Sequence, residues 1–452
     1  MRFAALFPPM LLALSSCGNG GSKLPDNIDY HTHIKPILRK NCVPCHQPGG
    51  AAPFSLDNFE RVRNKAKTIV KVTESGYMPP WPADPAWSHF LGEKVLSREE
   101  KEMLRRWFES GAQEGIPGPD NSNATTAIIR KVPDLVVPLE AISLKGDRQD
   151  RFFLIKAPGI MEQDTWVRAV EFAPGIPALV HHFNGHILNY DGRRKDHRSG
   201  SKAREVQMGA YGEHFPLLKL ENDDGSYPER VHSAVNYLPG MQGQFLPEGI
   251  GTFRLSKDFS IVGNDLHYGP AEKDTTDRSS IRIWFGSKPP ERPVYELMLG
   301  TNGVVKPQPP LVIPAGKKTV HYCRFKVNQD ISLVSVNPHM HLLGSSIRAW
   351  AEKPNGDTVK IIRIPQWNFR WQFVYTFPTF VRIPAGSEIV VEAHFDNTEA
   401  NPDNPFKPPV DVAERLEYGG ASMRATDEML QFIIQWTPYR KGDENIRLDG
   451  KP

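Results

Sequence analysis

Apolar and polar residues alternate along most of the chain after residue 131. Trp166–Phe172 and Ile281–Phe285 are two such segments, and Gly or Pro follows each of them closely. Because successive side chains on a strand point to opposite faces, this pattern predicts strands with one buried face. Two similar turns, Val312–Gly316 and Arg382–Gly386, favour hairpins. About 320 residues of this kind should form two β-sandwiches.

Helices are predicted in the first quarter of the chain, over Asn58–Lys71 and Ser97–Ser110. Ser97 and Glu100 form the Ser-x-x-Glu pattern of a capping box, which places the start of the second helix. The segment 115–123 is rich in Gly, Pro and Asn and is typical of a linker. These features predict a small helical domain ahead of the sandwiches.

Length and composition narrow the class of protein. A chain of 452 residues is too long for one ordinary domain. Its 41 prolines and 36 glycines favour many short strands over long helical bundles. Lys plus Arg (55) exceeds Asp plus Glu (52) by only three, so no nucleic-acid partner is expected. No apolar run reaches the roughly 20 residues of a membrane-spanning helix.

The N-terminus has the features of an export signal. Met1-Arg2 precedes the apolar stretch Phe3–Leu14, and Leu14-Ser15-Ser16-Cys17 resembles a bacterial lipobox. We therefore expect residues 1–17 to be a lipoprotein signal with Cys17 lipidated, followed by a flexible tether at 18–22. The alternatives are a plain signal peptide and a buried core cysteine. The lipoprotein reading implies a bacterial periplasmic protein that meets the membrane only through its lipid.

Cys42-Val43-Pro44-Cys45-His46 is the C-x-x-C-H pattern of covalent c-type haem attachment. The two thiols would bond the haem vinyl groups, and His46 would bind the iron. A zinc site needs two further Cys or His ligands nearby, and none follows. A thioredoxin-like redox pair would have no need of the histidine.

The second axial ligand of the haem iron is predicted to be Met78. It stands before Pro79 and Pro80, which would hold its loop extended, and thioethers are common haem ligands. The alternative is a core methionine, with His89 binding the iron instead. Cys323, the one remaining cysteine, is expected to be a lone buried thiol.

Three groups of histidines are candidate metal ligands. His339 and His341 are two residues apart, so on a strand they share one face and could bind one ion. The adjacent His181 and His182 would point oppositely on a regular strand, and only a strand end or a bulge would bring both to one ion. His267 stands alone, and a solitary histidine is more often simply hydrogen-bonded.

The order of these groups resembles a known family. His181-His182, then Leu266-His267-Tyr268, then His339-Met340-His341, then Asp427-Glu428-Met429 is similar to the copper type II monooxygenases, which include peptidylglycine α-hydroxylating and dopamine β-monooxygenases. The likeness spans roughly residues 132–438. The segments 78–84, 338–341 and 393–397 resemble the bacterial branch with a fused cytochrome c domain.

The resemblance implies a small all-α cytochrome c domain and two all-β antiparallel jelly-roll sandwiches. The implied boundaries are 18–118 for the cytochrome, 119–131 for a linker, and 132–300 and 301–452 for the sandwiches. It also implies two copper ions besides the covalent haem. The electron-transfer copper would be held by His181, His182 and His267, and the oxygen-binding copper by His339, His341 and Met429.

The activity that the resemblance implies is hydroxylation of a substrate C–H bond with O2. Electrons would come through the haem from a periplasmic donor or an ascorbate-like reductant. Two other classes stay open: a copper and haem electron carrier without oxygenase activity, and a cytochrome fused to a carbohydrate- or partner-binding sandwich. The full ligand set disfavours the last, since a binding module does not need Met429.

The substrate is expected to differ from that of the peptide enzyme. That enzyme holds a substrate carboxylate with an arginine two residues before the His-x-His pair and a tyrosine four after the ligand methionine. Asn337 and Ile433 stand at these positions here. A buried carboxylate without a cation is poorly compensated, so a less charged small molecule is expected. His186 could share a face with His182, either as a neighbouring group or as an alternative ligand.

Overall fold

The computed structural model describes residues 24–118, 132–206, 214–241, 243, 245–417, 420–421 and 424–450. The predicted lipidation site Cys17 and the whole of the predicted linker 119–131 lie outside these residues. Strand makes up 38% of the chain and helix 12%, and the sheets are antiparallel, so the prediction of a mainly antiparallel β protein is confirmed. In the part that the structure describes, no helix is both long enough and apolar enough to cross a membrane.

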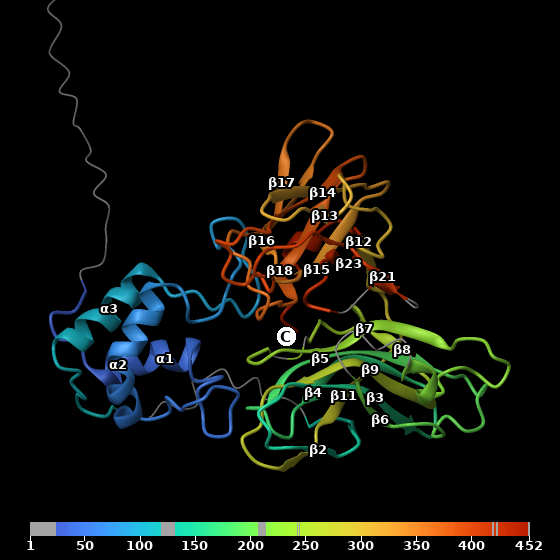
Figure 1. Ribbon diagram of the computed structural model, residues 1–452, viewed down its shortest axis with the longest axis horizontal. Helices are drawn as coiled ribbons and strands as arrows, with labels where there is room; N and C mark the ends of the chain where they lie inside the picture. Colours follow the sequence, from blue (N-terminus) through green and yellow to red (C-terminus); the bar gives the residue numbers. More distant parts are fainter. Residues whose placement is uncertain are drawn as a thin grey trace, which may run out of the picture.

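The N-terminal part is helical and has its own core (blue in Figure 1). Ser97 caps α3 as predicted: its Oγ accepts from the Glu100 N–H at 3.1 Å, and the Glu100 carboxylate accepts from the Ser97 N–H at 2.7 Å. Leu104 and Trp107 on α3 pack with Val62 of α2 in that core. The helices are η1 Tyr30–Ile34, α1 Lys35–Asn41, α2 Phe59–Glu74 and α3 Arg98–Glu109.

The first sandwich consists of two sheets that enclose a core around the stacked rings of Phe172 and Phe183 (4.6 Å). One sheet has the order β1-β11-β4-β8 and the other β6-β3-β9-β5-β7. The elements are β1 Leu135–Pro138, β2 Ile142–Leu144, β3 Arg151–Ile160, β4 Thr165–Ala173, β5 Val180–Asn189, β6 Ala203–Val206, η3 Phe215–Leu218, β7 Glu229–Tyr237, β8 Phe253–Leu255, β9 Asp258–Tyr268, β10 Thr275–Asp277 and β11 Ser280–Gly286.

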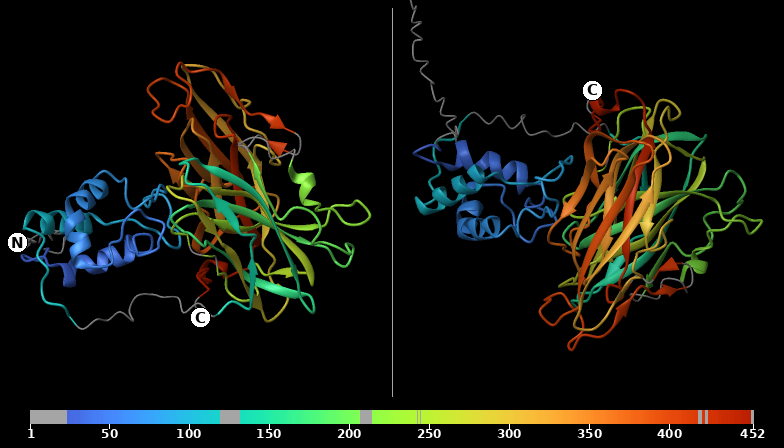
Figure 2. Two further views of the ribbon diagram at one scale, coloured as in Figure 1. Left: turned by 60° about the horizontal axis from the view of Figure 1, so that its bottom comes forward. Right: turned by 90° about the horizontal axis from the view of Figure 1, so that it is seen from above.

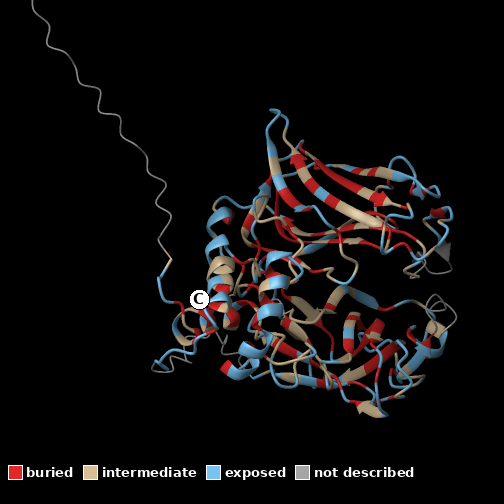
Figure 3. Ribbon diagram, turned by 60° about the vertical axis from the view of Figure 1, so that its left-hand side comes forward, coloured by how far each residue is buried: buried red, intermediate tan, exposed pale blue. Residues whose placement is uncertain are grey.

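The second sandwich has sheets in the orders β12-β23-β15-β18 and β14-β19-β16-β17. Buried residues run through the interior of both sandwiches (Figure 3), and Cys323 is among them as a free thiol, as predicted. The elements are β12 Tyr295–Gly300, β13 Val312–Ile313, β14 Lys318–Lys326, β15 Ile331–Met340, β16 Gly344–Glu352, β17 Thr358–Ile364, β18 Tyr375–Ile383, β19 Glu388–Asp396, β20 Val412–Ala413, β21 Leu416–Glu417, β22 Gly420–Ala421, β23 Leu430–Pro438 and η4 Asp443–Asn445.

The two sandwiches share one strand order. When the eight main strands of each are ranked along the chain, one sheet follows the order 1-8-3-6 and the other 2-7-4-5 in both sandwiches. Among the strands that the structure describes, β6 is the one added to these four sheets, at the edge of the first 2-7-4-5 sheet. Similar positions in the two halves can therefore carry similar functional residues.

Residues 79–96 form a strap that leaves the helical unit and packs on the second sandwich (Figure 2). The Phe90 side chain is only 4% exposed and packs 5.1 Å from the ring of Tyr375. Trp81 stacks on Phe373 at 5.7 Å, and the backbone N–H of Leu91 donates to Thr376 O at 2.8 Å. The strap lies within the predicted 18–118 domain but contributes to the core of the second sandwich.

Candidate metal centre

A cavity of about 440 Å³ lies between the two sandwiches. Its walls come from the β5, β7 and β9 side of the first sandwich and the β12, β15 and β23 side of the second. All six residues predicted to bind copper line it, three from each sandwich: His181, His182, His267, His339, His341 and Met429. The fold thus brings side chains that are far apart in the sequence into one cavity.

His181 and His182 reach the same place because β5 contains a bulge. The ladder to β9 pairs Val180 with Tyr268 and then His182 with His267, so His181 is an extra residue. This is one of the two conditions under which the sequence allowed both histidines to reach one ion. The His267 ring lies 4.7 Å from that of His181 and 5.0 Å from that of His182, measured between centroids.

Two carboxylates orient these rings. The Nε2–H of His182 donates to Asp265 at 2.6 Å, and that of His267 donates to Asp150 at 2.8 Å. Such bonds fix the tautomer and leave Nδ1 of both rings as the nitrogen for a metal. Asp150, which the sequence analysis did not single out, also lies with His181 and His267 in a group whose donor atoms are within 4.8 Å of one another.

Burial keeps most of this group neutral. It lowers the pKa of His181, and burial together with the neighbouring His182 lowers the pKa of His267 to about 4. Burial also opposes protonation of His182, but the Asp265 carboxylate outweighs it and raises the pKa of His182. Neutral imidazoles are the form that binds metal ions.

The positions of His339, His341 and Met429 follow from the register between β15 and β23. His339 pairs with Gln431 and Met340 with Leu430, so one further step places His341 opposite Met429. Residues opposite each other on neighbouring strands present their side chains on one face. His339 and His341 have ring centroids 5.1 Å apart, whereas Met340 points into the core. The predicted shared face of the His-x-His pair is therefore confirmed.

Glu428 fastens the strand ends that carry these ligands. Its buried carboxylate accepts from the backbone N–H groups of His341 (3.0 Å) and Leu343 (2.6 Å). The Nδ1–H of His341 donates to Asp427 O at 2.8 Å, which leaves Nε2 for a metal. Burial lowers the pKa of His339 to about 3, so this ring is also neutral. The Asp-Glu-Met motif was visible in the sequence, but the structural task of Glu428 was not.

Both groups fit copper by donor chemistry. Imidazoles serve either oxidation state of copper, and a thioether favours Cu(I). The rings whose pKa burial lowers, the free nitrogen on each oriented imidazole and the buried sulfur of Met429 all agree with this.

The C-x-x-C-H loop, predicted to attach haem, keeps both thiols and one nitrogen of its histidine available. Cys42 and Cys45 are half-buried and not in disulfides. The Nδ1–H of His46 donates to Phe54 O at 2.9 Å, which leaves Nε2 for iron. Met78 is half-buried on the loop after α2, and its N–H donates to Val72 O at 3.0 Å. His89, the alternative ligand, is 71% exposed and lies 3.2 Å from Glu93.

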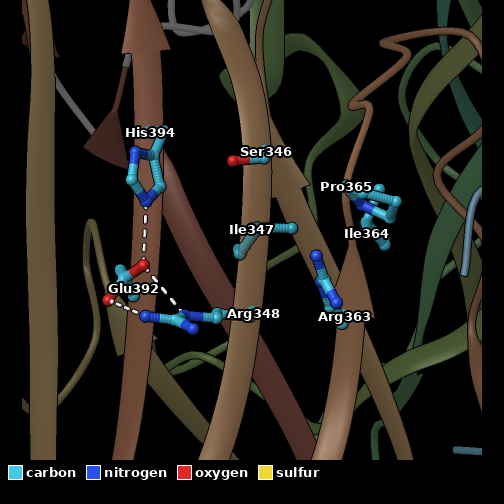
Figure 4. A pocket seen from close by; sticks show the side chains of 8 residues that line it. All are labelled: Ser346, Ile347, Arg348, Arg363, Ile364, Pro365, Glu392 and His394. Carbon is cyan, nitrogen blue, oxygen red and sulfur yellow. Dashed lines mark hydrogen bonds and ion pairs between the residues drawn. The ribbon is translucent and has the colours of Figure 1, made fainter. Parts of the chain in front are cut away.

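Three other histidines have partners of their own. His186 lines the cavity, and its Nδ1 accepts from the Ser233 N–H at 3.2 Å. His321 bonds Pro309 O at 2.8 Å, as expected for a structural residue. His394 donates to Glu392, which also accepts two bonds from Arg348, and all three line a hollow of about 290 Å³ on β16, β17 and β19 (Figure 4).

No family model matches the chain, and no curated protein matches it. Similarity to solved structures is weak, as two of the matching structures show. The structure of Sulfolobus Turreted Icosahedral Virus aligns over 68% of this chain and 90% of its own, with 10% identity and a TM-score of 0.20. That of infectious bursal disease virus Gx strain aligns over 70% and 77%, with 8% identity and a TM-score of 0.18. Likenesses of this degree carry no argument about fold or function.

Proposed function

We propose that this chain is a copper-dependent monooxygenase that hydroxylates a C–H bond of a small organic substrate with O2, using electrons supplied through a fused c-type haem. The observation that carries the proposal is the convergence of His181, His182 and His267 with His339, His341 and Met429 on one cavity between two sandwiches. A pure electron carrier does not need such a cavity, which favours an oxygenase over the carrier.

The architecture supports the finer parts of this assignment. The orders 1-8-3-6 and 2-7-4-5 in facing sheets are those of a jelly roll, which makes 132–300 and 301–452 two jelly-roll domains in this proposal. The helices with their own core and the C-x-x-C-H loop support a cytochrome c domain over 18–118. Cys17 would anchor the protein in a bacterial membrane facing the periplasm.

The chain's own residues would prepare the cavity for the reaction. Copper, when bound at the two groups, would supply one-electron redox chemistry and a place for O2. Phe369, Trp371 and Val374 give the cavity apolar wall, which limits water near the reacting C–H bond. The amide side chains of Asn337 and Gln431 offer hydrogen bonds to polar parts of a substrate.

The experiment that tests the proposal is the copper content of purified holoprotein loaded with Cu(I) without air. We expect two coppers per haem, and one in the double variant His339→Ala, Met429→Ala. His394→Ala, whose histidine lies in the outer hollow, is the matched control and should keep both. One copper or none in the wild type would contradict the assignment.

Dependence on the haem is tested by removing its attachment site. The double variant Cys42→Ala, Cys45→Ala should lose substrate hydroxylation driven by a cytochrome reductant, measured as label from isotopic O2 in the product. Undiminished turnover with that reductant would show that electrons enter elsewhere.

A further inference from the structure

We propose that the end of β7 contacts the edge of the haem. It would also be the route by which electrons pass from the haem to the group of His181, His182 and His267. This inference rests on the proposed function. It concerns the backbone of Gly240, the side chain of Tyr237 and the contact that Lys94 makes from the strap.

The first observation is a close approach between the haem-attachment loop and the first sandwich. A Cβ on Gly240 would lie 2.5 Å from Cys45 Sγ and 2.8 Å from Lys94 Nζ, and Gly240 has a φ of +80°. Only glycine fits both the backbone conformation and the space. Because Cys45 is one of the two cysteines that would bond the haem, the haem edge would lie against this backbone.

Lys94, on the strap, stabilises the contact between the haem loop and Gly240. Its Nζ donates to Gly240 O at 2.9 Å and lies 5.9 Å from the centre of the Phe373 ring in the second sandwich. Burial lowers the pKa of Lys94. A lysine held in this way ties the strap, the haem loop and both sandwiches together at one point.

A short path through paired strands leads from this contact to the histidines. Tyr237 lies three residues before Gly240 and pairs with Phe183 on β5, and Phe183 directly follows His182. His182 in turn pairs with His267 on β9. One cross-strand pair and one peptide step therefore separate Tyr237 from a predicted copper ligand. Burial raises the pKa of Tyr237 to about 12, with the nearby Cys45 contributing, so the phenol stays neutral.

A competing path begins on the strap. Trp81 stacks on Phe373 at 5.7 Å, and Phe373 stacks on Trp371 at 6.1 Å, which lines the cavity. These steps pass between side chains rather than along paired strands.

Each transfer through the β7 path would oxidise ferrous haem to ferric haem and reduce Cu(II) to Cu(I), which moves one electron and no proton. An external one-electron donor would reduce the haem again.

The test uses full-length protein carrying haem and copper, in which the haem is photoreduced and its reoxidation is followed by absorbance. Copper-free protein supplies the baseline. Gly240→Ala should slow the copper-dependent reoxidation at least about tenfold, because small misplacements of reacting partners cost large factors in rate. The matched control is Gly225→Ala, where φ is +78° but nothing lies within 4 Å of an added Cβ. It should transfer electrons at the wild-type rate.

A second readout does not depend on copper. Gly240→Ala and Lys94→Met should both speed amide hydrogen exchange in the haem loop, residues 42–52, whereas Gly225→Ala should not. Wild-type exchange and wild-type reoxidation in Gly240→Ala would overturn the inference. Loss of transfer in Trp81→Leu with none in Gly240→Ala would assign the route to the aromatic path. Failure of the wild type to bind copper would disprove the proposed function. The exchange data would still decide whether the end of β7 contacts the haem loop.

Discussion

Asn337 on β15 lies directly opposite Ile433 on β23, and both line the cavity between the sandwiches. The predicted family resemblance would place the carboxylate-binding arginine and tyrosine of the peptide enzyme at these two positions. The Asn337 amide donates to Phe373 O at 2.9 Å, so it is held in place by the second sandwich. The pair leaves this part of the cavity with one neutral amide and one aliphatic side chain.

We expect Asn337→Arg to create affinity for carboxylates that the wild type lacks. An arginine at this point would supply the charge that a buried carboxylate requires, and such charge-assisted pairs are worth about 1.5–3 kcal/mol. Calorimetric titration with N-acetylglycine should show binding to Asn337→Arg at least about tenfold tighter than to the wild type. Asn337→Gln is the control, because it lengthens the side chain without adding charge. Equal affinity in all three proteins would refute the role of this pair.

Gly269→Ala should disturb the histidine-only group without altering a ligand. A Cβ on Gly269 would overlap the His181 imidazole, and Gly269 is buried with its N–H donating to Leu179 O at 2.8 Å. The ring must therefore move. Changes to the residues around a metal-binding histidine commonly cost about 10–100-fold in metal affinity. Copper titration should show one weakened site, and Gly118→Ala, where a Cβ meets nothing, should leave both intact.

Met78→Ala should change the haem spectrum, because it removes the predicted thioether from the iron. We expect the absorbance and magnetic circular dichroism bands of methionine-ligated ferric haem to disappear, with a lower reduction potential. His89→Ala is the matched control, since its ring is exposed beside Glu93. The reverse pattern, in which His89→Ala changes the spectrum and Met78→Ala does not, would assign the ligand to His89.

The local patterns in the sequence predicted the elements well. Alternation at Trp166–Phe172 matches β4, and the Ser97 capping box begins α3 where it was expected. The shared face of His339 and His341 followed from strand periodicity alone. In these cases the deciding interactions lie within a few residues of each other, so the sequence contains the information.

The long-range features could not be predicted in the same way. The bulge at His181 depends on how β5 pairs with β9, more than eighty residues away. Asp150 and Asp265 meet their histidines only after β3, β5 and β9 align, and nothing in their local sequence marks them. The packing of residues 79–96 on the second sandwich and the approach of Cys45 to Gly240 likewise depend on how separate units meet.

The last prediction concerns Lys156 on β3, which is 1% exposed. Its Nζ donates to Ser199 O (2.8 Å), Leu218 O (2.9 Å) and Lys219 O (3.1 Å) and ties the segment after β5 to the first sandwich. Burial lowers the pKa of Lys156 from 10.5 to about 8. Lys156→Met removes this titration but leaves the three carbonyls without their donor.

Below pH 8, Lys156 is protonated in both the folded and the unfolded chain, so its contribution to stability does not change with pH. Between pH 8 and 10.5 the unfolded chain binds one more proton than the folded chain, and the wild type should gain stability as pH rises. The gain is at most about 1.4 kcal/mol per pH unit. Urea unfolding across this range should show the difference in free energy of unfolding between wild type and Lys156→Met growing with pH, whereas a constant difference would contradict the lowered pKa.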